Sequence, residues 1–229
     1  MVAAVRVHKT GGPEVLTYEQ IEIGAPGPGQ VKLKQHASGV NYIDTYFRMG
    51  MYPAPAGLPF VSGNEGAGEV IAVGPGVTAL KVGDRVGYVV AMGAYAEERL
   101  LAADRAVKLP DNISYEQAAA MMLKGMTAEY LLRRTYNVKN GDTILVHAAA
   151  GGVGMILCQW GNALGATVIG TVGSEVKGKL ALANGAHHVI YYRKEDFAAR
   201  VKEITKGALC NVVYDGIGKT TFQIGRAHV

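Results

Sequence analysis

The sequence predicts an α/β protein with two domains, a β-barrel followed by an incomplete parallel sheet flanked by helices. Three observations support this fold class. The first half consists of short apolar or alternating runs between Gly- and Pro-rich turns, strands and helices alternate after residue 114, and a glycine-rich loop joins a buried strand to a helix near residue 150. Many short strands with tight turns favour a barrel or sandwich, whereas alternating strands and helices favour a parallel sheet.

The elements follow in order along the chain. Strands are expected in the first half at 3–8, 31–35, 69–73 and 86–90. Ser114 and Gln117 have the spacing of a capping box, and the helix after them is expected to break at Gly125 and restart at Thr127 to reach Arg134. Strands at 143–147, 167–172, 188–192 and 211–214 then alternate with helices at 152–164, 176–184 and 196–206. The domains are therefore predicted to span residues 1–123 and 124–222.

Composition excludes several classes of protein. The net charge is +4 with scattered Lys and Arg, which argues against nucleic acid as the primary partner. No apolar run has the length of a membrane span and the N-terminus has no signal-peptide pattern, so a cytoplasmic protein is expected. Cys158 and Cys210 lie in apolar segments and are expected to be buried reduced thiols.

The loop between the strand at 143–147 and the next helix carries the clearest motif. Its pattern is A-x-x-G-x-x-G, with small residues at Ala148, Gly151 and Gly154, and with Gly152 and Val153 between them. Small residues let the backbone approach a diphosphate, and the helix N-terminus offers free N–H groups. Since the strand, the helix and a second strand occur where a dinucleotide-binding unit needs them, we expect a cofactor here. The alternative is a tight strand–helix turn of another α/β protein.

The end of the second strand in this unit indicates which dinucleotide binds. NAD-preferring sites usually have Asp or Glu at this tip, but here Gly173 and Ser174 follow the strand. A 2′-phosphate can enter, and Lys177 can balance its charge, so NADPH is predicted. Glu175 could instead point at the ribose, and Lys177 could be an ordinary solvated helix residue.

The chain resembles the zeta-crystallin-like quinone oxidoreductases, a zinc-free group of the medium-chain dehydrogenase/reductase superfamily. The resemblance is carried from residue 1 to about 222 by HKTGGPEVL, GVNYIDTYFRMGMYP, GNEGAGEVIAVGPGV, KVGDRV, GAYAEE, QAAAMMLKGMTAEYLL, HAAAGGVG, GTVGS and VVYDGIGK. It implies a GroES-like β-barrel catalytic domain, then a Rossmann (doubly wound parallel sheet) domain, incomplete here, with the site in the cleft between them.

The resemblance also implies roles for individual residues. Asn41 and Asp44 are expected beside the nicotinamide and its ribose, and Tyr46 and Tyr52 are expected to line a quinone pocket. Each Tyr could instead be an ordinary half-buried barrel residue, and Asp44 a local helix cap. Thr127 resembles a residue on the nicotinamide side and Tyr192 one near the adenosine phosphate, although a helix-cap or strand-end role is open for both. For His147 a hydrogen-bonded structural role is favoured over proton donation.

No metal site is predicted. Zinc dehydrogenases of the superfamily carry Cys and His ligands where this sequence has Asn41, Asp44 and Asn64, and a catalytic zinc needs three protein ligands that Glu65 alone does not supply. The predicted reaction is therefore hydride transfer from NADPH to a quinone without a metal. One alternative is an enone or acrylate reductase on the same fold, and another is a crystallin-like or RNA-binding protein without enzymatic activity.

The end of the sequence departs from the family pattern after Phe222. The family continues past the fourth Rossmann strand, whereas residues 223–229 resemble a translated sequencing adapter, or else a short splice-variant tail. The expectation is a fragment with an exposed edge strand, weak NADPH binding and poor turnover, whereas the full-length form is expected to be an active homodimer.

Overall fold

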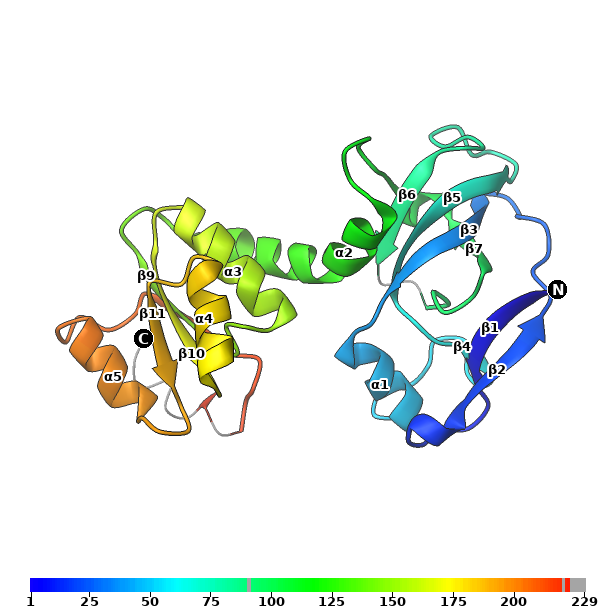
Figure 1. Ribbon diagram of the computed structural model, residues 1–229. Coiled ribbons are helices and arrows are strands. Elements are labelled where there is room, and N and C mark those ends of the chain that lie inside the picture. Colours follow the sequence, from blue (N-terminus) through cyan, green and yellow to red (C-terminus); the bar gives the residue numbers. More distant parts are fainter. Residues whose placement is uncertain (90–91, 220, 223–229) are drawn as a thin grey trace. The chain divides into compact units, whose positions relative to one another are not determined.

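The computed structural model describes residues 1–89, 92–219 and 221–222, and the chain separates into two compact units, Met1–Leu123 and Lys124–Val229. Most helices and strands of each unit are labelled in Figure 1. The predicted tail at 223–229 lies outside the described residues.

The first unit is built from two antiparallel sheets, with the strand orders β2-β1-β4 and β7-β3-β5-β6-β8. Alternation along β3 buries Val31 and Leu33 fully, whereas Lys34, the next residue of the strand, is exposed. The elements are β1 (Val2–Val7), β2 (Leu16–Ile21), β3 (Gln30–Gly39), α1 (Tyr42–Met49), β4 (Phe60–Val61), β5 (Glu65–Val73), β6 (Arg85–Val89), β7 (Glu98–Ala102) and β8 (Val107–Lys108), with 3-10 turns at Pro13–Val15 and Ala103–Arg105.

A long helix, α2 (Tyr115–Tyr130), follows the strands of the first unit and continues into a π-helical turn, Leu131–Thr135. The predicted capping box is confirmed: the Ser114 N–H donates to Gln117 Oε1 at 2.9 Å, and the Gln117 N–H donates to Ser114 Oγ at 3.1 Å. The predicted break at Gly125 is wrong, because α2 runs through that residue. A glycine costs a helix interior only about 1 kcal/mol relative to alanine, which burial of neighbours such as Ala128 offsets.

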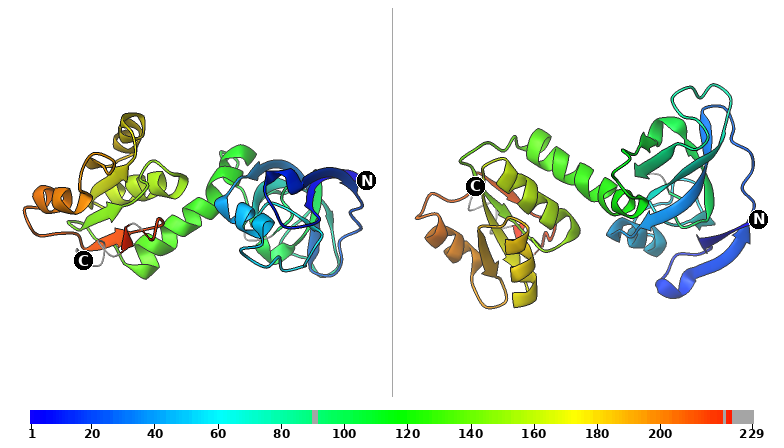
Figure 2. Two further views of the ribbon diagram at one scale, coloured as in Figure 1. Left: turned by 90° about the horizontal axis from the view of Figure 1, so that it is seen from below. Right: turned by 45° about the horizontal axis from the view of Figure 1, so that its top comes forward.

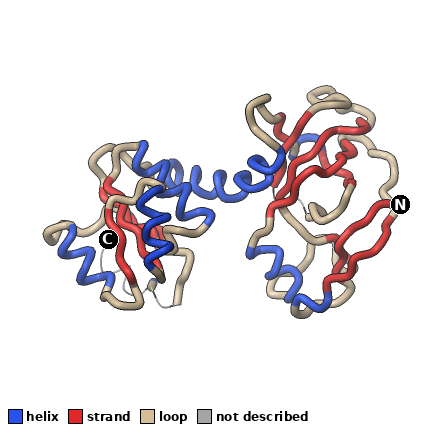
Figure 3. Tube along the Cα trace, in the orientation of Figure 1, coloured by secondary structure: helices blue, strands red, loops and turns tan. Residues whose placement is uncertain are grey.

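The second unit is a parallel sheet with the order β11-β10-β9-β12, so β12 lies at an edge of the sheet that the described residues form. Figure 3 shows these strands together, and the two further views in Figure 2 show the helices around them. The elements are β9 (Thr143–Val146), α3 (Gly152–Ala163), β10 (Thr167–Val172), α4 (Glu175–Ala183), β11 (His188–Tyr191), α5 (Phe197–Ile204) and β12 (Val212–Tyr214).

Both faces of this sheet are covered. Ile144 and Val146 of β9 pack with α3 and α4 on one face, whereas Leu145 between them packs on the opposite face with Phe197 and Val201 of α5. Burial on both faces is the usual condition of a parallel sheet and explains its continuous apolar strands. The predicted fold class, a GroES-like barrel unit followed by a Rossmann-like unit, is confirmed.

Two sequence-based expectations about burial and membranes can be compared with this fold. Cys158 and Cys210 are buried free thiols as predicted, and burial raises the pKa of each to about 11. Among the described residues, none of the helices is long and apolar enough to cross a membrane.

Candidate functional site

In the first unit, the candidate residues gather at the start of α1. Asn41 lies in extended backbone at the N-cap position, and its N–H donates to Asp44 Oδ2 at 3.0 Å. Asp44 is only 5% exposed, and its carboxylate also accepts hydrogen bonds from Asn64 Nδ2 at 2.8 Å and from the Tyr95 hydroxyl at 2.8 Å. Asp44 therefore has the capping contact that the sequence left open, and in addition it joins three separate segments of the barrel.

Glu65 extends this polar network. It is fully buried, accepts a hydrogen bond from Asn41 Nδ2 at 2.8 Å on one oxygen, and accepts from the Leu123 N–H at 2.7 Å on the other. A Cβ on Gly39 would lie 2.3 Å from Glu65 Oε2 and 2.2 Å from the Ala119 carbonyl oxygen. Only glycine at position 39 lets the end of β3, the Glu65 carboxylate and α2 meet.

Tyr95 is a member of the network that the sequence reading missed. Burial, and next to it the Asp44 carboxylate that accepts the hydroxyl proton, raise the pKa of Tyr95 well above its ordinary value. The ring packs against Gly63, where a Cβ would lie 2.5 Å from Tyr95 Cδ1. The GAYAEE segment did mark this region, but no spacing rule connects Tyr95 to Asp44.

Side-chain amide groups thus donate hydrogen bonds to both buried carboxylates. Asn64 and Asn41 are donors toward Asp44 and Glu65, and an amide nitrogen is not a zinc ligand. In the part of the chain that is described, no group of three His, Cys, Asp or Glu side chains is placed to hold a metal ion. The metal-free site remains a prediction, and this network is consistent with it.

Tyr46 and Tyr52 are brought together by the end of α1. Gly50 has a φ of 76° and ends the helix, and the N–H groups of Met51 and Tyr52 then both bind the Tyr46 carbonyl oxygen, at 2.9 and 3.2 Å. The two rings pack edge to face with centroids 5.5 Å apart, while Tyr52 remains 47% exposed. This aromatic pair offers an apolar surface with hydroxyl groups available to a ligand.

In the second unit, the glycine loop has the close packing that the motif predicts. A Cβ on Gly154 would lie 2.3 Å from the Ala148 carbonyl oxygen, and Gly151 forms the N-cap of α3 in extended backbone. Ala148 itself has a φ of 51°, in the left-handed region. Gly152, Val153 and Gly154 form the first turn of α3, whose N–H groups have no acceptor within the helix.

Lys124 borders this loop, and the sequence reading did not select it. A Cβ on Gly152 would lie 2.7 Å from Lys124 Cδ, so glycine lets the lysine side chain cross the start of α3. Thr127, which the sequence did select, lies inside α2 one turn beyond Lys124 and is half-buried. A helix-cap role for Thr127 is therefore excluded by its position in the helix.

The tip of β10 is surrounded by polar side chains. Gly173 follows the strand, and Ser174 caps α4 by accepting a hydrogen bond from the Lys177 N–H at 3.4 Å. Glu175 is the residue that could instead point at the ribose. Its carboxylate pairs with the Lys194 side chain at 3.3 Å. A Cβ on Gly173 would lie 2.8 Å from the Tyr192 hydroxyl oxygen, which places the predicted Tyr192 against this tip.

His147, for which a hydrogen-bonded structural role was predicted, is buried at the end of β9. Its Nδ1 lies 2.9 Å from Thr171 Oγ1, and its ring packs edge to face on Phe197 at 4.9 Å. Burial lowers the pKa of His147, and the nearby Asp215 opposes this in part. A packed imidazole with a hydrogen bond to Thr171 is consistent with a structural role.

Two protein-family models match the chain, the alcohol dehydrogenase GroES-like domain over residues 27–111 and the zinc-binding dehydrogenase domain over residues 152–226. A quinone oxidoreductase of Pseudomonas aeruginosa is 53% identical over 224 residues, which are 97% of this chain and 69% of that relative. The chain belongs to the quinone oxidoreductase family. It is a member of the medium-chain dehydrogenase/reductase superfamily, as the sequence motifs predicted.

Two further proteins that the chain resembles bear on function. A 2-haloacrylate reductase of a Burkholderia species is 50% identical over 228 residues, covering 97% of this chain and 68% of that relative. The crystal structure of the Escherichia coli quinone oxidoreductase complexed with NADPH matches with a TM-score of 0.94 and 49% identity, covering 97% of this chain and 68% of that one. The site residues predicted for this family member remain predictions.

Proposed function

We propose that the protein is a metal-independent reductase that uses NADPH to reduce a quinone. The observation that carries this proposal is the glycine loop at the start of α3, where the space for a Cβ at Gly154 is filled by backbone atoms. Gly154 lets α3 pack closely on the loop after β9, and the exposed Gly151 and Gly152 leave room for a diphosphate against the helix N–H groups. This arrangement fits a dinucleotide. Family membership supports quinone as the substrate class.

The second unit supplies the groups that would hold the cofactor. The N–H groups of Gly152 and Val153 at the start of α3 would bind the diphosphate, and Lys177 near the tip of β10 would bind the 2′-phosphate. When bound, the nicotinamide supplies the hydride that reduces the quinone. Thr127 in α2 would contact the nicotinamide side.

The first unit supplies orientation for the substrate. The rings of Tyr46 and Tyr52 would pack on the quinone, and the exposed Tyr52 hydroxyl would donate a hydrogen bond to the oxygen on which negative charge develops. Asn41 and Asp44 would contact the ribose and nicotinamide while the buried network fixes their orientation. A hydroquinone forms when the reduced ring also takes up a proton, which the exposed Tyr52 can relay from solvent.

A second candidate is reduction of an activated alkene, and the 50% identity to a 2-haloacrylate reductase favours it specifically. That reaction needs a proton delivered to carbon rather than to oxygen. Comparison of a benzoquinone with a 2-haloacrylate and an α,β-unsaturated ketone, following loss of NADPH absorbance, distinguishes the two. Alkene reduction without quinone reduction would contradict the first proposal.

The partners follow from the same reasoning. We infer a small-molecule substrate in the cytoplasm rather than RNA, because the net charge is only +4 and basic residues are scattered. The full-length family form is proposed to be a homodimer. A gel-shift assay in which NADPH fails to displace bound RNA would contradict the inference of a small-molecule substrate. Sedimentation of the full-length form tests whether it is a homodimer.

A further inference from the structure

Arg193 lies beside the proposed 2′-phosphate site, although neither the motifs nor the family resemblance selected it. A Cβ on Gly173 would lie 2.8 Å from the Tyr192 hydroxyl oxygen and 3.5 Å from Arg193 Nε. Both side chains therefore reach from the turn after β11 to the tip of β10. Glycine at position 173 makes this approach possible, because any side chain there would meet them.

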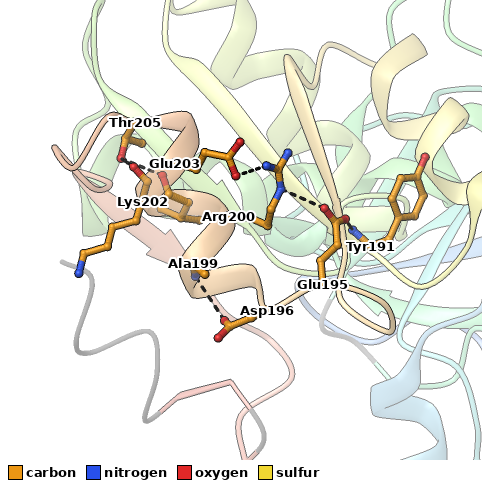
Figure 4. Close-up of polar contacts among 9 residues, drawn as sticks. Tyr191, Glu195, Asp196, Ala199, Arg200, Lys202, Glu203 and Thr205 are labelled. Carbon is orange, nitrogen blue, oxygen red and sulfur yellow. Dashed lines mark hydrogen bonds and ion pairs between the residues drawn. The ribbon is translucent and has the colours of Figure 1, made fainter.

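The turn that carries Arg193 is held by a set of hydrogen bonds and ion pairs. The N–H groups of Lys194 and Glu195 bind the Tyr191 carbonyl oxygen at 2.8 and 3.0 Å, and Glu195 Oε2 accepts from the Tyr191 N–H at 2.7 Å. Arg200 in α5 pairs with the other oxygen of Glu195 at 2.9 Å, as Figure 4 shows. The backbone of the turn at Arg193 is thus held before any ligand binds, which lowers the entropy that binding must overcome.

The Tyr191 side chain fixes the turn to α4 as well. A Cβ on Gly178 of α4 would lie 2.5 Å from the Tyr191 hydroxyl oxygen, so the ring sits directly against the helix. At the other end of the turn, Asp196 caps α5 by accepting hydrogen bonds from the N–H groups of Ala198 and Ala199. Figure 4 shows the second of these. Both neighbouring helices therefore hold the turn in place.

The charges around Gly173 are unequal. The first turn of α4 and the turn at 192–195 carry three cations, Lys177, Arg193 and Lys194, against Glu175 and Glu195. Because Glu195 is paired with Arg200 of α5, two positive charges remain. Lys194 pairs with Glu175 at 3.3 Å, whereas in the described part of the chain Lys177 and Arg193 form no ion pair. A phosphate monoester carries between about 1.5 and 2 negative charges at pH 7, so this excess matches one phosphate group.

We propose that Arg193 binds the 2′-phosphate of the dinucleotide and that Lys194, by pairing with Glu175, keeps this carboxylate from favouring a dinucleotide without that phosphate. The inference rests on the proposed function, because it assigns two further residues to its cofactor site. The planar guanidinium of Arg193 can form two parallel hydrogen bonds to phosphate oxygens. Glu175, if released, would repel a phosphate and could accept a hydrogen bond from a ribose 2′-hydroxyl.

Binding of adenosine 2′,5′-bisphosphate tests the role of Arg193 without any redox chemistry. In calorimetric titrations of the 229-residue chain, Arg193→Ala should weaken this ligand by about tenfold, in line with loss of a charge-assisted contact. NADH binding, followed by its fluorescence, should change less than twofold. Lys202→Ala on the exposed side of α5 removes the same charge elsewhere and is the matched control. The assignment would be overturned if Arg193→Ala weakened the bisphosphate and NADH equally. It would also be overturned if Lys202→Ala lost as much affinity for the bisphosphate as Arg193→Ala.

A double variant separates the role of Lys194 from a direct phosphate contact. Lys194→Ala should weaken adenosine 2′,5′-bisphosphate and strengthen NADH, each several-fold, because it frees the Glu175 carboxylate. Adding Glu175→Ala should restore both affinities toward the parent values. If the double variant binds the bisphosphate as weakly as the single one, Lys194 does not act through Glu175.

Failure of this inference can be distinguished from failure of the proposed function. If the parent chain reduces a quinone with NADPH while Arg193→Ala keeps the parent preference for the bisphosphate, the inference alone is wrong. If the parent binds the bisphosphate through Arg193 but reduces neither a quinone nor an alkene, the proposed reaction is wrong and the phosphate site remains. A parent chain that does not bind the bisphosphate overturns the inference.

Discussion

Tyr95 donates a hydrogen bond from its hydroxyl group to Asp44 Oδ2 over 2.8 Å, although the two residues are 51 positions apart in the sequence. The same carboxylate also accepts from the Asn41 backbone and the Asn64 side chain. One buried carboxylate therefore connects the start of α1 with two loops of the barrel. The geometry of the candidate residues Asn41 and Asp44 depends on contacts that lie outside their own motif.

Tyr95→Phe should weaken the barrel by removing this contact. Hydrogen bonds to charged groups contribute about 1.5–3 kcal/mol, and the buried Asp44 would lose one of its three donors. We expect the free energy of unfolding in urea to fall by about 1–3 kcal/mol. Tyr18→Phe, at a residue that is 74% exposed, is the control and should stay within about 0.5 kcal/mol of the parent. Equal stability of the two variants would show that the Tyr95 hydroxyl contributes nothing.

Gly39→Ala should disrupt the contact between β3, Glu65 and α2. The new Cβ would lie 2.2 Å from the Ala119 carbonyl oxygen, and backbone atoms cannot move away as a flexible side chain can. We expect a loss of about 2–4 kcal/mol in the free energy of unfolding, measured by urea denaturation. Gly24→Ala is the matched control, because nothing lies within 4 Å of a Cβ there. A Gly39→Ala variant as stable as the Gly24→Ala variant would contradict the close approach.

Sequence patterns predicted the fold well where periodicity and turns decide it. The four parallel strands and the capping box at Ser114 follow from local rules that the packing does not oppose. The break expected at Gly125 failed because a weak local preference was outweighed by the packing of a long helix. The positions of helices and strands were thus easier to predict than a break within a helix.

The polar network of the candidate site could not be derived in the same way. Asn64 and Tyr95 meet Asp44 across 20 and 51 residues of sequence, and Arg193 reaches Gly173 from a different strand. No spacing rule relates such positions, because the sheet topology brings them together only after the strands have paired. The glycine motif was accessible because all its members lie within one turn.

Gly154→Ala should damage the second unit and its proposed ligand site together. The added Cβ would lie 2.3 Å from the Ala148 carbonyl oxygen and 2.8 Å from Ala149 Cα, so the start of α3 must move away from β9. We expect at least tenfold weaker NADPH binding by fluorescence, since a displacement of the helix N-terminus misplaces its N–H groups. Gly216→Ala, with nothing within 4 Å of its Cβ, should bind NADPH like the parent. Unchanged NADPH binding by Gly154→Ala would rule out this loop as the diphosphate site.

His147 should make the stability of the second unit depend on pH. Burial lowers its pKa below the ordinary value of 6.5, so the unfolded chain binds a proton more readily than the folded chain. The free energy of unfolding is then highest above pH 6.5 and decreases as the pH falls from there toward the lower folded-state pKa. For one titrating group the decrease is at most about 1.4 kcal/mol per pH unit.

Urea denaturation between pH 7.5 and pH 5.5 measures this dependence. His147→Asn retains a polar atom for Thr171 Oγ1 but does not titrate, so its unfolding midpoint should fall less with pH than that of the parent. His188→Gln is the control, because it replaces an exposed histidine of the same unit. If the parent and His147→Asn lose stability in parallel, His147 is not the group responsible, and protonation elsewhere in the chain accounts for the dependence.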